Sequence, residues 1–437
     1  MLSRLRYISI CKGGIFLEYL KKAKPVDGRR QQDLEAEVHA IIRDVAVRGD
    51  EALIEYNTQF DGNTRTGLRI SPEEIRRAYE LTSPALIEDL KTAAQRLEDF
   101  AVKQKASLHG FTDYEISPGI FLGQNIIPVD SCCCYVPGGG YPLYSTALMM
   151  GITARTAGVR RIAMCTPAVN GTDSVHPSTL VAMDIAGIHE IYALSGAHAI
   201  AAFACGTKQI QPVDMIVGPG NQYVTEAKRQ CYGRIGIDFL AGPSEILVIA
   251  DRNAAPSCIA ADLLSESEHD PQAIARLITT DRELGLEVIR QVKKQLPELE
   301  TEDIASASWN SCGEVILADS LKDACRLANA FAPEHLVLQF DDALAYTDHF
   351  KNYGSLFIGK YSAVVYSDYV NGINHTLPTG KAARYSGGVW IGTFSRVCTT
   401  QRLTKEAAQR ISGLASHLAE GEGFPGHANA ASIRMKT

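Results

Sequence analysis

Short apolar runs alternate with amphipathic stretches along residues 160–360, and this alternation limits the possible folds more than any other feature of the sequence. Each run has four to six residues, which is the length and composition of a buried strand. The runs are 161–165, 190–194, 214–217, 245–250, 275–279, 313–317, 335–339 and 355–358. Between them lie stretches with the length and apolar spacing of helices, namely 176–186, 198–205, 222–232, 256–269, 283–296 and 321–331. Strands that alternate with helices form parallel sheets with helices on their faces, and this many elements predict two α/β units.

Residues 30–105 place apolar side chains at helical spacing, for example Leu34, Val38 and Ile41, with charged residues between them. This pattern predicts amphipathic helices ahead of the first strands. The segment from residue 376 onward is rich in Gly, Arg and Thr and loses the alternation. We therefore expect a C-terminal tail that packs outside its own α/β units.

The overall charge excludes two classes of partner. A formal net charge of −7 leaves no basic surface for nucleic acid and does not favour an anionic membrane. No stretch approaches the roughly 20 apolar residues that span a bilayer. Arg4, Arg6 and Lys12 interrupt the apolar N-terminus, which argues against a secretion signal. An organelle-targeting segment stays open as an alternative, since no acidic residue precedes Glu18.

The 11 cysteines are odd in number, are scattered from Cys11 to Cys398, and include no CxxC pair. This usage is typical of reduced thiols that serve as small apolar residues, so we expect a cytoplasmic protein. In a strand, the adjacent residues Cys132, Cys133 and Cys134 would point to opposite faces. Such a run cannot form one metal cage.

Four glycine-containing loops are the candidates for ligand contact: YVPGGG at 135–140, LSGAHA at 194–199, GPGN at 218–221 and AGPSE at 241–245. In open α/β sheets, ligands bind beyond the carboxyl ends of strands, where glycine lets the backbone approach a ligand closely. Each loop alone is more often a simple turn, but four of them in one chain favour a ligand site. None matches GxGxxG, so the usual dinucleotide fingerprint is absent.

Glu266 and His269 lie three residues apart in a segment typical of a helix end, so both can reach one metal ion. Asp368 and His427 are further oxygen and nitrogen donors in glycine-containing loops. Two carboxylates and two imidazoles suit Zn²⁺ or a similar divalent ion. A lone ExxH pair is more often only a solvated helix end, and spacing alone does not bring the four residues together.

Glu334 and His335 stand at the start of the predicted strand 335–339. Histidine exchanges a proton near neutral pH, and a neighbouring carboxylate can activate water. Oxidation of an alcohol to an acid needs both functions. A base takes a proton in each hydride step, and a base activates the water that hydrates the aldehyde. A hydrogen-bonded structural histidine is the alternative.

With these residues in place, the sequence resembles the histidinol dehydrogenase family from about residue 30 to residue 430. The motifs occur in the family's order and are VPGG, IVGPGN, YVTEAK, GIDFLAGPSEILVIAD, ADLLS-x-x-EH, FAPEHL, NH-x-LPT and EG-x-x-x-H. The resemblance implies two incomplete Rossmann-like parallel-sheet domains, with a helical N-terminal and an extended C-terminal extension. It also implies an intertwined homodimer in which the tail of one subunit completes the site of the other.

The implied division of the chain has four parts. They are an N-terminal arm at 1–25, a first α/β domain at 26–130 with 245–375, a second α/β domain at 131–244, and a tail at 376–437. The first domain would carry the metal and catalytic residues, and the second would face NAD.

The resemblance further implies roles for single residues. Glu334 and His335 would be the general bases of a two-step oxidation that uses two molecules of NAD. NAD would contact Tyr135, Asn221 and His198, the last of which stands where the family has a glutamine. One Zn²⁺ per subunit would bind Glu266, His269, Asp368 and His427 and orient the substrate. The substrate would contact Ser244, His375 and Glu422 together with the metal ligands and His335.

The sequence departs from the family pattern at positions that bear on the substrate. Glu266 replaces a glutamine and adds a negative charge to the metal site. The segment GGVWIG at 387–392 resembles a paralogous branch that includes sulfopropanediol dehydrogenase, which turns 2,3-dihydroxypropane-1-sulfonate into sulfolactate. Lys381 is either a cation for such an anion or a surface lysine. We therefore expect a small, anionic primary alcohol as substrate, with L-histidinol as the alternative.

Two other classes of protein remain as alternatives. One is an aldehyde dehydrogenase with a cysteine nucleophile, for which Cys134 and Cys205 are the candidates. The other is an inactive binding homologue, against which the Glu334–His335 pair and the four metal donors argue.

Overall fold

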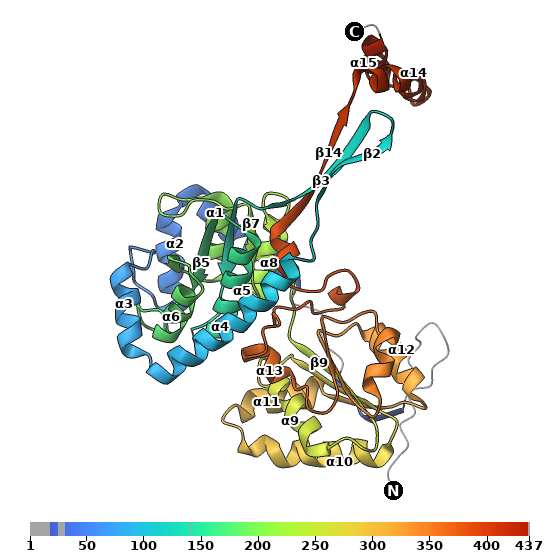
Figure 1. Cartoon of the computed structure of the whole chain (residues 1–437). Helices are drawn as coiled ribbons and strands as arrows, with labels where there is room; N and C mark the ends of the chain where they lie inside the picture. The colour runs from blue at the N-terminus through green and yellow to red at the C-terminus, as the bar shows by residue number, and fades with distance from the viewer. Residues whose placement is uncertain (1–17, 25–30, 140, 436–437) are drawn as a thin grey trace.

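The computed structural model describes residues 18–24, 31–139 and 141–435, which form two parallel sheets with helices on both faces and a projecting arm (Figure 1). The six-stranded sheet has the order β1-β11-β10-β9-β12-β13, and within it only the edge strand β1 pairs antiparallel. Its strands are β1 (Glu18–Lys21), β9 (Glu245–Ala250), β10 (Ile274–Thr279), β11 (Glu314–Leu317), β12 (His335–Gln339) and β13 (Ser355–Ile358). This sheet and its helices are called the six-stranded unit below.

The five-stranded sheet is wholly parallel and has the order β6-β5-β4-β7-β8. Its strands are β4 (Ser131–Tyr135), β5 (Arg161–Thr166), β6 (Glu190–Ala193), β7 (Met215–Val217) and β8 (Gly236–Ile237). The cysteine run forms the central strand β4. Cys132 and Cys134 pack in one core cluster and Cys133 in another, so neighbouring thiols do point to opposite faces.

Helices cover both faces of each sheet and pack against its apolar side chains. In the six-stranded unit, one face carries α9 (Pro256–Ser267), α10 (Arg282–Gln295), α11 (Glu302–Cys312) and α13 (Val364–Tyr369). The other face carries α12 (Leu321–Phe331) and the 3-10 segment η3 (Ala343–His349). A short η2 (Leu296–Glu298) follows α10. Burial of this much apolar surface is the main favourable contribution to folding.

The five-stranded unit has the same layered construction. One face carries α3 (Pro72–Leu81), α4 (Pro84–Lys105), α5 (Tyr144–Ala157) and α6 (Pro177–Ile185). The other face carries α1 (Gln31–Arg48), α2 (Asp50–Tyr56), α7 (Gly196–Cys205) and α8 (Gln222–Cys231), with the π-helical turn η1 (Asn57–Asp61) after α2. The 3-10 segments η4 (Ala382–Arg384) and η5 (Ile391–Phe394) precede the arm.

The helices α1–α4 correct the predicted grouping of 26–130 with 245–375. They pack against α5–α8 and belong to the five-stranded unit. Their amphipathic pattern shows that one face is buried, but it does not show which sheet covers that face. Of the predicted N-terminal arm, residues 1–17 and 25 lie outside the described part of the chain, and residues 18–21 form β1.

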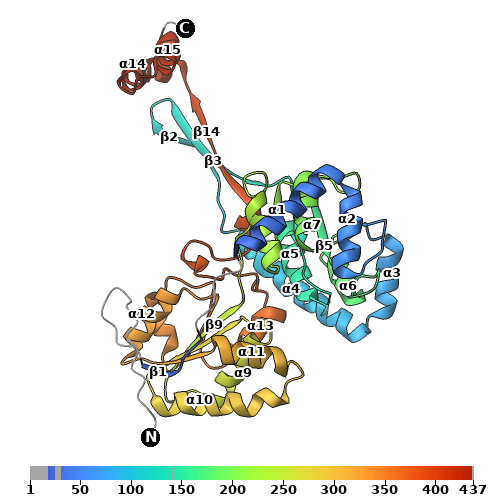
Figure 2. The same cartoon turned by 180° about the vertical axis from the view of Figure 1, so that it is seen from behind.

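The arm is built from β2 (Phe111–Ser117), β3 (Ile120–Pro128) and β14 (Ser395–Leu403), which project away from both units (Figures 1 and 2). β14 pairs antiparallel with β3 over its whole length. At the far end lie α14 (Lys405–Gly421), α15 (Pro425–Ser432) and η6 (Ile433–Met435). The expected extended tail is therefore extended only along β14, and the segment after it is helical. Thr404 caps α14, since its hydroxyl accepts from the Ala407 backbone N–H.

All eight predicted strands and all six helices listed from the alternation are present, and their ends differ by a few residues. The elements that the pattern missed have a physical reason. Ten of the 14 residues of α5 are buried, so this helix lacks the polar stripe that marks an amphipathic helix. Most side chains of β2 and β14 are exposed on both faces, so these strands show no alternation of core and solvent. Within the described residues, no helix is long and apolar enough to cross a membrane.

His198 lies in α7 where that helix packs against α2 and η1. Its side chain is 1% exposed, its Nε2 is 3.1 Å from Asn57 Oδ1, and its ring contacts the rings of Tyr56 and Phe60. Burial lowers the pKa of His198 to about 3. The imidazole is therefore neutral in the folded protein at any pH at which the protein works.

Replacing this histidine should reduce the acid sensitivity of the fold. Between about pH 6.5 and pH 3, His198 binds a proton in the unfolded chain but not in the folded protein. The contribution of neutral His198 to the free energy of unfolding is therefore complete above about pH 6.5 and is lost as pH falls. At pH 5 the loss amounts to about 2 kcal/mol. Thermal unfolding of His198→Gln should therefore depend less on pH between 7 and 5 than that of the wild type. The exposed His39→Gln is the control, and a His198→Gln protein with wild-type pH dependence would contradict the assignment.

Candidate active site

The predicted bases lie at the amino edge of the six-stranded sheet. His335 is the first residue of β12, which pairs with β9 and β13 in the interior of the sheet. Glu266 reaches the same edge because α9 runs back along the sheet after β9 and ends there. The AGPSE loop joins β8 to β9, so it follows a strand of the five-stranded sheet and leads into the amino edge of the six-stranded sheet. The rule that ligands bind at carboxyl ends does not describe the amino edge that carries Glu266 and His335.

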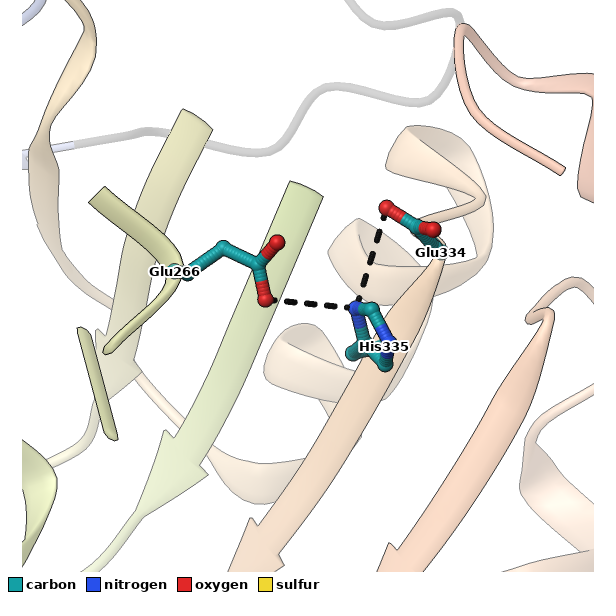
Figure 3. Close-up of side chains that lie close together, drawn as sticks. All are labelled: Glu266, Glu334 and His335. Carbon is teal, nitrogen blue, oxygen red and sulfur yellow. Dashed lines mark ion pairs between the residues drawn. The ribbon is translucent and has the colours of Figure 1, made fainter. Parts of the chain in front are cut away.

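Glu266, Glu334 and His335 form a tight buried cluster (Figure 3). His335 Nδ1 lies 3.3 Å from Glu266 Oε2 and 3.7 Å from Glu334 Oε2. All three side chains are almost fully buried. The cluster joins residues that are 68 positions apart in sequence, and only the folded chain brings them together.

The backbone of Glu245 holds two members of this cluster. Its N–H donates to Glu334 Oε2 at 2.9 Å, and its carbonyl oxygen lies 3.1 Å from His335 Nδ1. Since a carbonyl oxygen only accepts, Nδ1 carries the proton in this arrangement. His335 Nε2 is then the free base, and it is buried without a hydrogen-bond partner.

Burial sets the protonation of the cluster. It lowers the pKa of His335, so the imidazole is neutral near pH 7. It raises the pKa of Glu334 well above its ordinary value, and the nearby charge of Glu266 raises it further. It also raises the pKa of Asp368 to about 7. Both carboxyl groups therefore hold a proton more strongly than exposed carboxyl groups do.

Asp368 and His375 complete the site around the cluster. The charges of His335 and Glu266 both act on Asp368, and Asp368 Oδ1 lies 3.9 Å from His375 Nδ1. His375 Nε2 lies 3.2 Å from the hydroxyl of Thr146, at the start of α5. This contact joins the two units, since α5 begins at the carboxyl edge of the five-stranded sheet.

Two further predicted residues lie at the same edge. Ser244, which directly precedes β9, hydrogen-bonds to the Glu266 carboxylate and thereby opposes the burial that raises its pKa. The charge of His269 acts on both Glu266 and His375, and its side chain is exposed. The charges of His269 and Asp368 thus act on members of the buried cluster, and their binding of one metal ion together with Glu266 stays a prediction.

Glu422 and His427 do not join this group within one chain. Glu422 ends α14 and His427 lies in α15, and both side chains are exposed at the tip of the arm (Figure 2). His427 contacts the ring of Phe424 there. Their predicted roles therefore need a second copy of the chain.

The donors fit a divalent cation. Ligand atoms of Glu266, Glu334 and His335 lie within 4.8 Å of one another, so a cation at this edge would have oxygen and nitrogen donors beside it. Burial disfavours the charged form of the carboxylates around it, and a cation would offset that cost. Oxygen and imidazole donors are those that Zn²⁺ accepts.

The carboxyl edge of the five-stranded sheet fits a nucleotide. Tyr135 ends β4, and its phenol oxygen accepts from the Gly196 N–H at the start of α7. Asn221 caps α8 through Oδ1, which accepts from the N–H groups of Tyr223 and Val224. A small cavity beside these loops is lined by Gly138, Gly139, Tyr141, Thr166, Pro167, Val169, Val175, His176 and Thr179. Backbone at glycines and at a helix start suits the phosphates of a dinucleotide.

His198 offers no contact surface at this edge, which corrects the prediction that it contacts NAD. Its side chain is enclosed between α7 and the α2–η1 turn and offers no exposed atoms to NAD. Lys381 is exposed in a left-handed turn, and its charge acts on Glu245. It therefore lies near the site without entering the buried cluster.

The cysteine alternative finds no support in the geometry. Cys134 is fully buried in β4, and its hydrogen bond with Cys132 together with burial raises its pKa well above the ordinary value. A nucleophilic cysteine needs the opposite shift. Cys205 lies at the end of α7, away from the amino edge that carries His335.

Sequence reasoning missed Glu245, Thr146 and Thr379. Glu245 acts through its backbone, which no residue pattern reveals, and its side chain accepts from the Gly380 N–H. Thr379 accepts from the Gly242 N–H, so the segment after His375 is attached to the start of β9 twice. The polar glutamate at the start of a fully buried strand was a signal that could have been used.

The fold and the site are those of an α/β enzyme. A neutral base lies among buried carboxyl groups, beside a sheet edge that suits a nucleotide, and oxidation of an alcohol requires such a base. The family model described as histidinol dehydrogenase matches residues 26–435. A relative named "Histidinol dehydrogenase homolog" from Shouchella clausii is 42% identical over 421 residues, covering 96% of this chain and 99% of that protein.

Histidinol dehydrogenase from Agrobacterium fabrum is 43% identical over 406 residues, covering 92% of this chain and 93% of that protein. The crystal structure of histidinol dehydrogenase from Elizabethkingia anophelis matches with a TM-score of 0.89 at 37% identity, covering 95% of this chain and 94% of that chain. The chain belongs to the histidinol dehydrogenase family and is an NAD-dependent oxidoreductase acting on a CH–OH donor.

Metal binding by substituted chains tests the ligand set. Glu266→Gln should keep zinc, since an amide oxygen still ligates, whereas Glu266→Ala should weaken binding by about 10-fold or more. Zinc per chain is measured by atomic emission after dialysis against a buffered series of free zinc. Glu268→Gln is the control, because the Glu268 carboxylate accepts a hydrogen bond from Thr301 and is not among the proposed ligands. Equal zinc affinity in Glu266→Ala and the wild type would remove Glu266 from the metal site.

Proposed function

We propose that this protein oxidises L-histidinol through the aldehyde to the carboxylate, with two hydride transfers to NAD. The observation that carries the proposal is the neutral, buried His335, whose Nε2 has no partner beside Glu334 and Glu266. The relatives named histidinol dehydrogenase support the same activity.

His335 takes the proton of the substrate hydroxyl at Nε2. The Glu245 carbonyl holds the proton on Nδ1 and fixes the ring, so the basic nitrogen keeps one orientation. The nicotinamide ring of bound NAD supplies the hydride acceptor. Burial lowers the pKa of His335, so the imidazole is neutral near pH 7 and able to accept a proton.

Glu334 serves the aldehyde step. One carboxylate oxygen is held by the Glu245 N–H, and burial raises the pKa of the group above its ordinary value, which makes it a stronger base than an exposed carboxylate. It activates the water that adds to the aldehyde carbonyl, and His335 then serves the second oxidation. Ser244 and His375 lie at the same edge and contact the substrate.

A zinc ion would be held by Glu266, His269 and Asp368, with His427 from a second copy of the chain. It would hold and orient the substrate's polar groups and lower the pKa of a bound hydroxyl. The support in this chain is the shared electrostatic influence of Glu266, His269, Asp368 and His335 on one another.

The relatives named histidinol dehydrogenase favour L-histidinol over the anionic alcohol expected from the sequence. Lys381, the cation expected to attract a sulfonate, is exposed, and its charge acts on Glu245 outside the buried cluster. 2,3-Dihydroxypropane-1-sulfonate therefore becomes the second candidate.

The working form is proposed to be a homodimer that exchanges arms. Apolar side chains are exposed along the arm, and large exposed apolar surfaces of this kind mark interfaces. They include Phe111, Tyr114, Ile116, Val397, Leu414, Leu418 and Phe424. Exchange would place Glu422 and His427 over the partner's cluster.

The ten cysteines of the described residues are all free thiols, which fits the reducing cytoplasm.

A substrate comparison tests the activity. With zinc present, L-histidinol should give two NADH per alcohol oxidised, and its kcat/KM should exceed that of 2,3-dihydroxypropane-1-sulfonate at least tenfold. Lys381→Met should leave kcat/KM for L-histidinol within about twofold. A preference for the sulfonate that Lys381→Met abolishes would overturn the substrate assignment. Glu334→Gln serves as a mechanistic control and should slow the aldehyde more than the alcohol.

Mixed dimers test the exchange of arms. His335→Asn and His427→Ala should each be nearly inactive alone, because each subunit pair then lacks a base or a metal ligand at both sites. Mixed and refolded chains should recover about a quarter of wild-type activity, since half of the dimers are mixed and each restores one site. Absence of recovery in dimers shown to be mixed by mass spectrometry would mean that each site is built from one chain.

A further inference from the structure

A buried ion pair lies beneath the GPGN loop. Lys228 comes from α8 and Asp238 directly follows β8, and their side chains are 3% and 1% exposed. Lys228 Nζ donates to Asp238 Oδ1. None of the functional roles assigned above uses this pair.

The pair holds both polar groups of one glycine. Lys228 Nζ donates to the Gly218 carbonyl oxygen at 2.9 Å, and the Gly218 N–H donates to Asp238 Oδ2 at 2.8 Å. Gly218 follows the last residue of β7 and opens the loop that leads to Asn221. The position of the loop is therefore set from within the protein by two fully desolvated charges.

Gly218 is also pressed against the end of β4. It adopts φ +121°, and a Cβ built on it would lie 2.2 Å from the Tyr135 carbonyl oxygen. A side chain at this position would push the loop away from β4. The ion pair and the close contact together fix Gly218 relative to Tyr135, and both predicted NAD-contacting segments meet at this point.

The energetics favour a positioning role over a purely stabilising one. A buried ion pair often gives no more stability than a well-packed apolar pair of the same volume, because both charges lose their water. Apolar side chains could fill the space, but they could not bond to the N–H and the carbonyl of Gly218. The feature that only the ion pair supplies is a fixed loop backbone.

We propose that Lys228 and Asp238 are positioning residues for the dinucleotide, which hold the 218–221 loop and the start of α8 in the geometry that binds NAD. The inference rests on the proposed use of NAD at this edge. Loss of the pair would leave the chemistry at His335 intact, since that cluster belongs to the other sheet. Its effect should therefore appear in the binding of the dinucleotide and not in the binding of the alcohol or of zinc.

The test measures NADH binding to the full-length protein by calorimetry, beside steady-state kinetics. Asp238→Asn and Lys228→Met should raise the Kd for NADH and the KM for NAD by about 10-fold, with KM for L-histidinol and zinc content within twofold of wild type. Amide hydrogen exchange at 218–221 should become faster. The double variant Lys228→Met with Asp238→Leu removes both charges and keeps the space filled, so it serves if a single variant unfolds.

The matched control is Glu314→Gln, which disrupts another little-exposed pair, Arg276 Nε to Glu314 Oε2 at 2.6 Å, in the six-stranded sheet. It should lower the melting temperature without changing the Kd for NADH. A folded double variant with wild-type Kd and wild-type exchange at 218–221 would overturn the positioning role alone. A wild-type protein that binds no NADH would instead overturn the proposed function, and this inference with it.

Discussion

The parallel pairing of β9 with β12 is the constraint on which the active site depends. It places the backbone of Glu245 beside the start of β12, where its N–H holds Glu334 and its carbonyl holds His335. A single peptide segment thereby orients both proposed bases, and it leaves the histidine nitrogen that points away from it free. The hydrogen bonds are buried, so no water competes for the same groups. Any change that shifts these two strands relative to one another would therefore alter both bases at once.

Two opposite sheet edges meet to build the complete site. The six-stranded sheet contributes its amino edge, with His335 and Glu266, whereas the five-stranded sheet contributes its carboxyl edge, with the glycine loops. The His375–Thr146 contact joins the two edges. In the proposed function, this arrangement separates acid–base chemistry from the binding of the dinucleotide. Each function is carried by a rigid sheet, and the hydride would pass between them.

The arm is the part of the chain through which we propose that two subunits associate. β14 and β3 carry α14 and α15 away from the body, and the arm exposes apolar side chains that a separate monomer would leave in water. Glu422 and His427 lie at its tip, far in sequence from the metal donors that they are proposed to join. In this proposal, association and completion of the metal site are one event, and an isolated chain would lack a ligand.

The sequence by itself determined most strands and helices of the two sheets and the glycine loops, because periodicity and local motifs are short-range properties of the chain. It singled out Glu266, Glu334 and His335 but did not bring them together. It also determined the family, through motifs spread over most of the length. Only the tertiary structure decided which sheet α1–α4 cover, that His198 is enclosed, and that the backbone of Glu245 orients the bases. An amphipathic stripe shows that a face is buried but carries no information about its partner. The same limit applies to Lys228 and Asp238, whose ordinary charges gain their role only when packing removes the water around them.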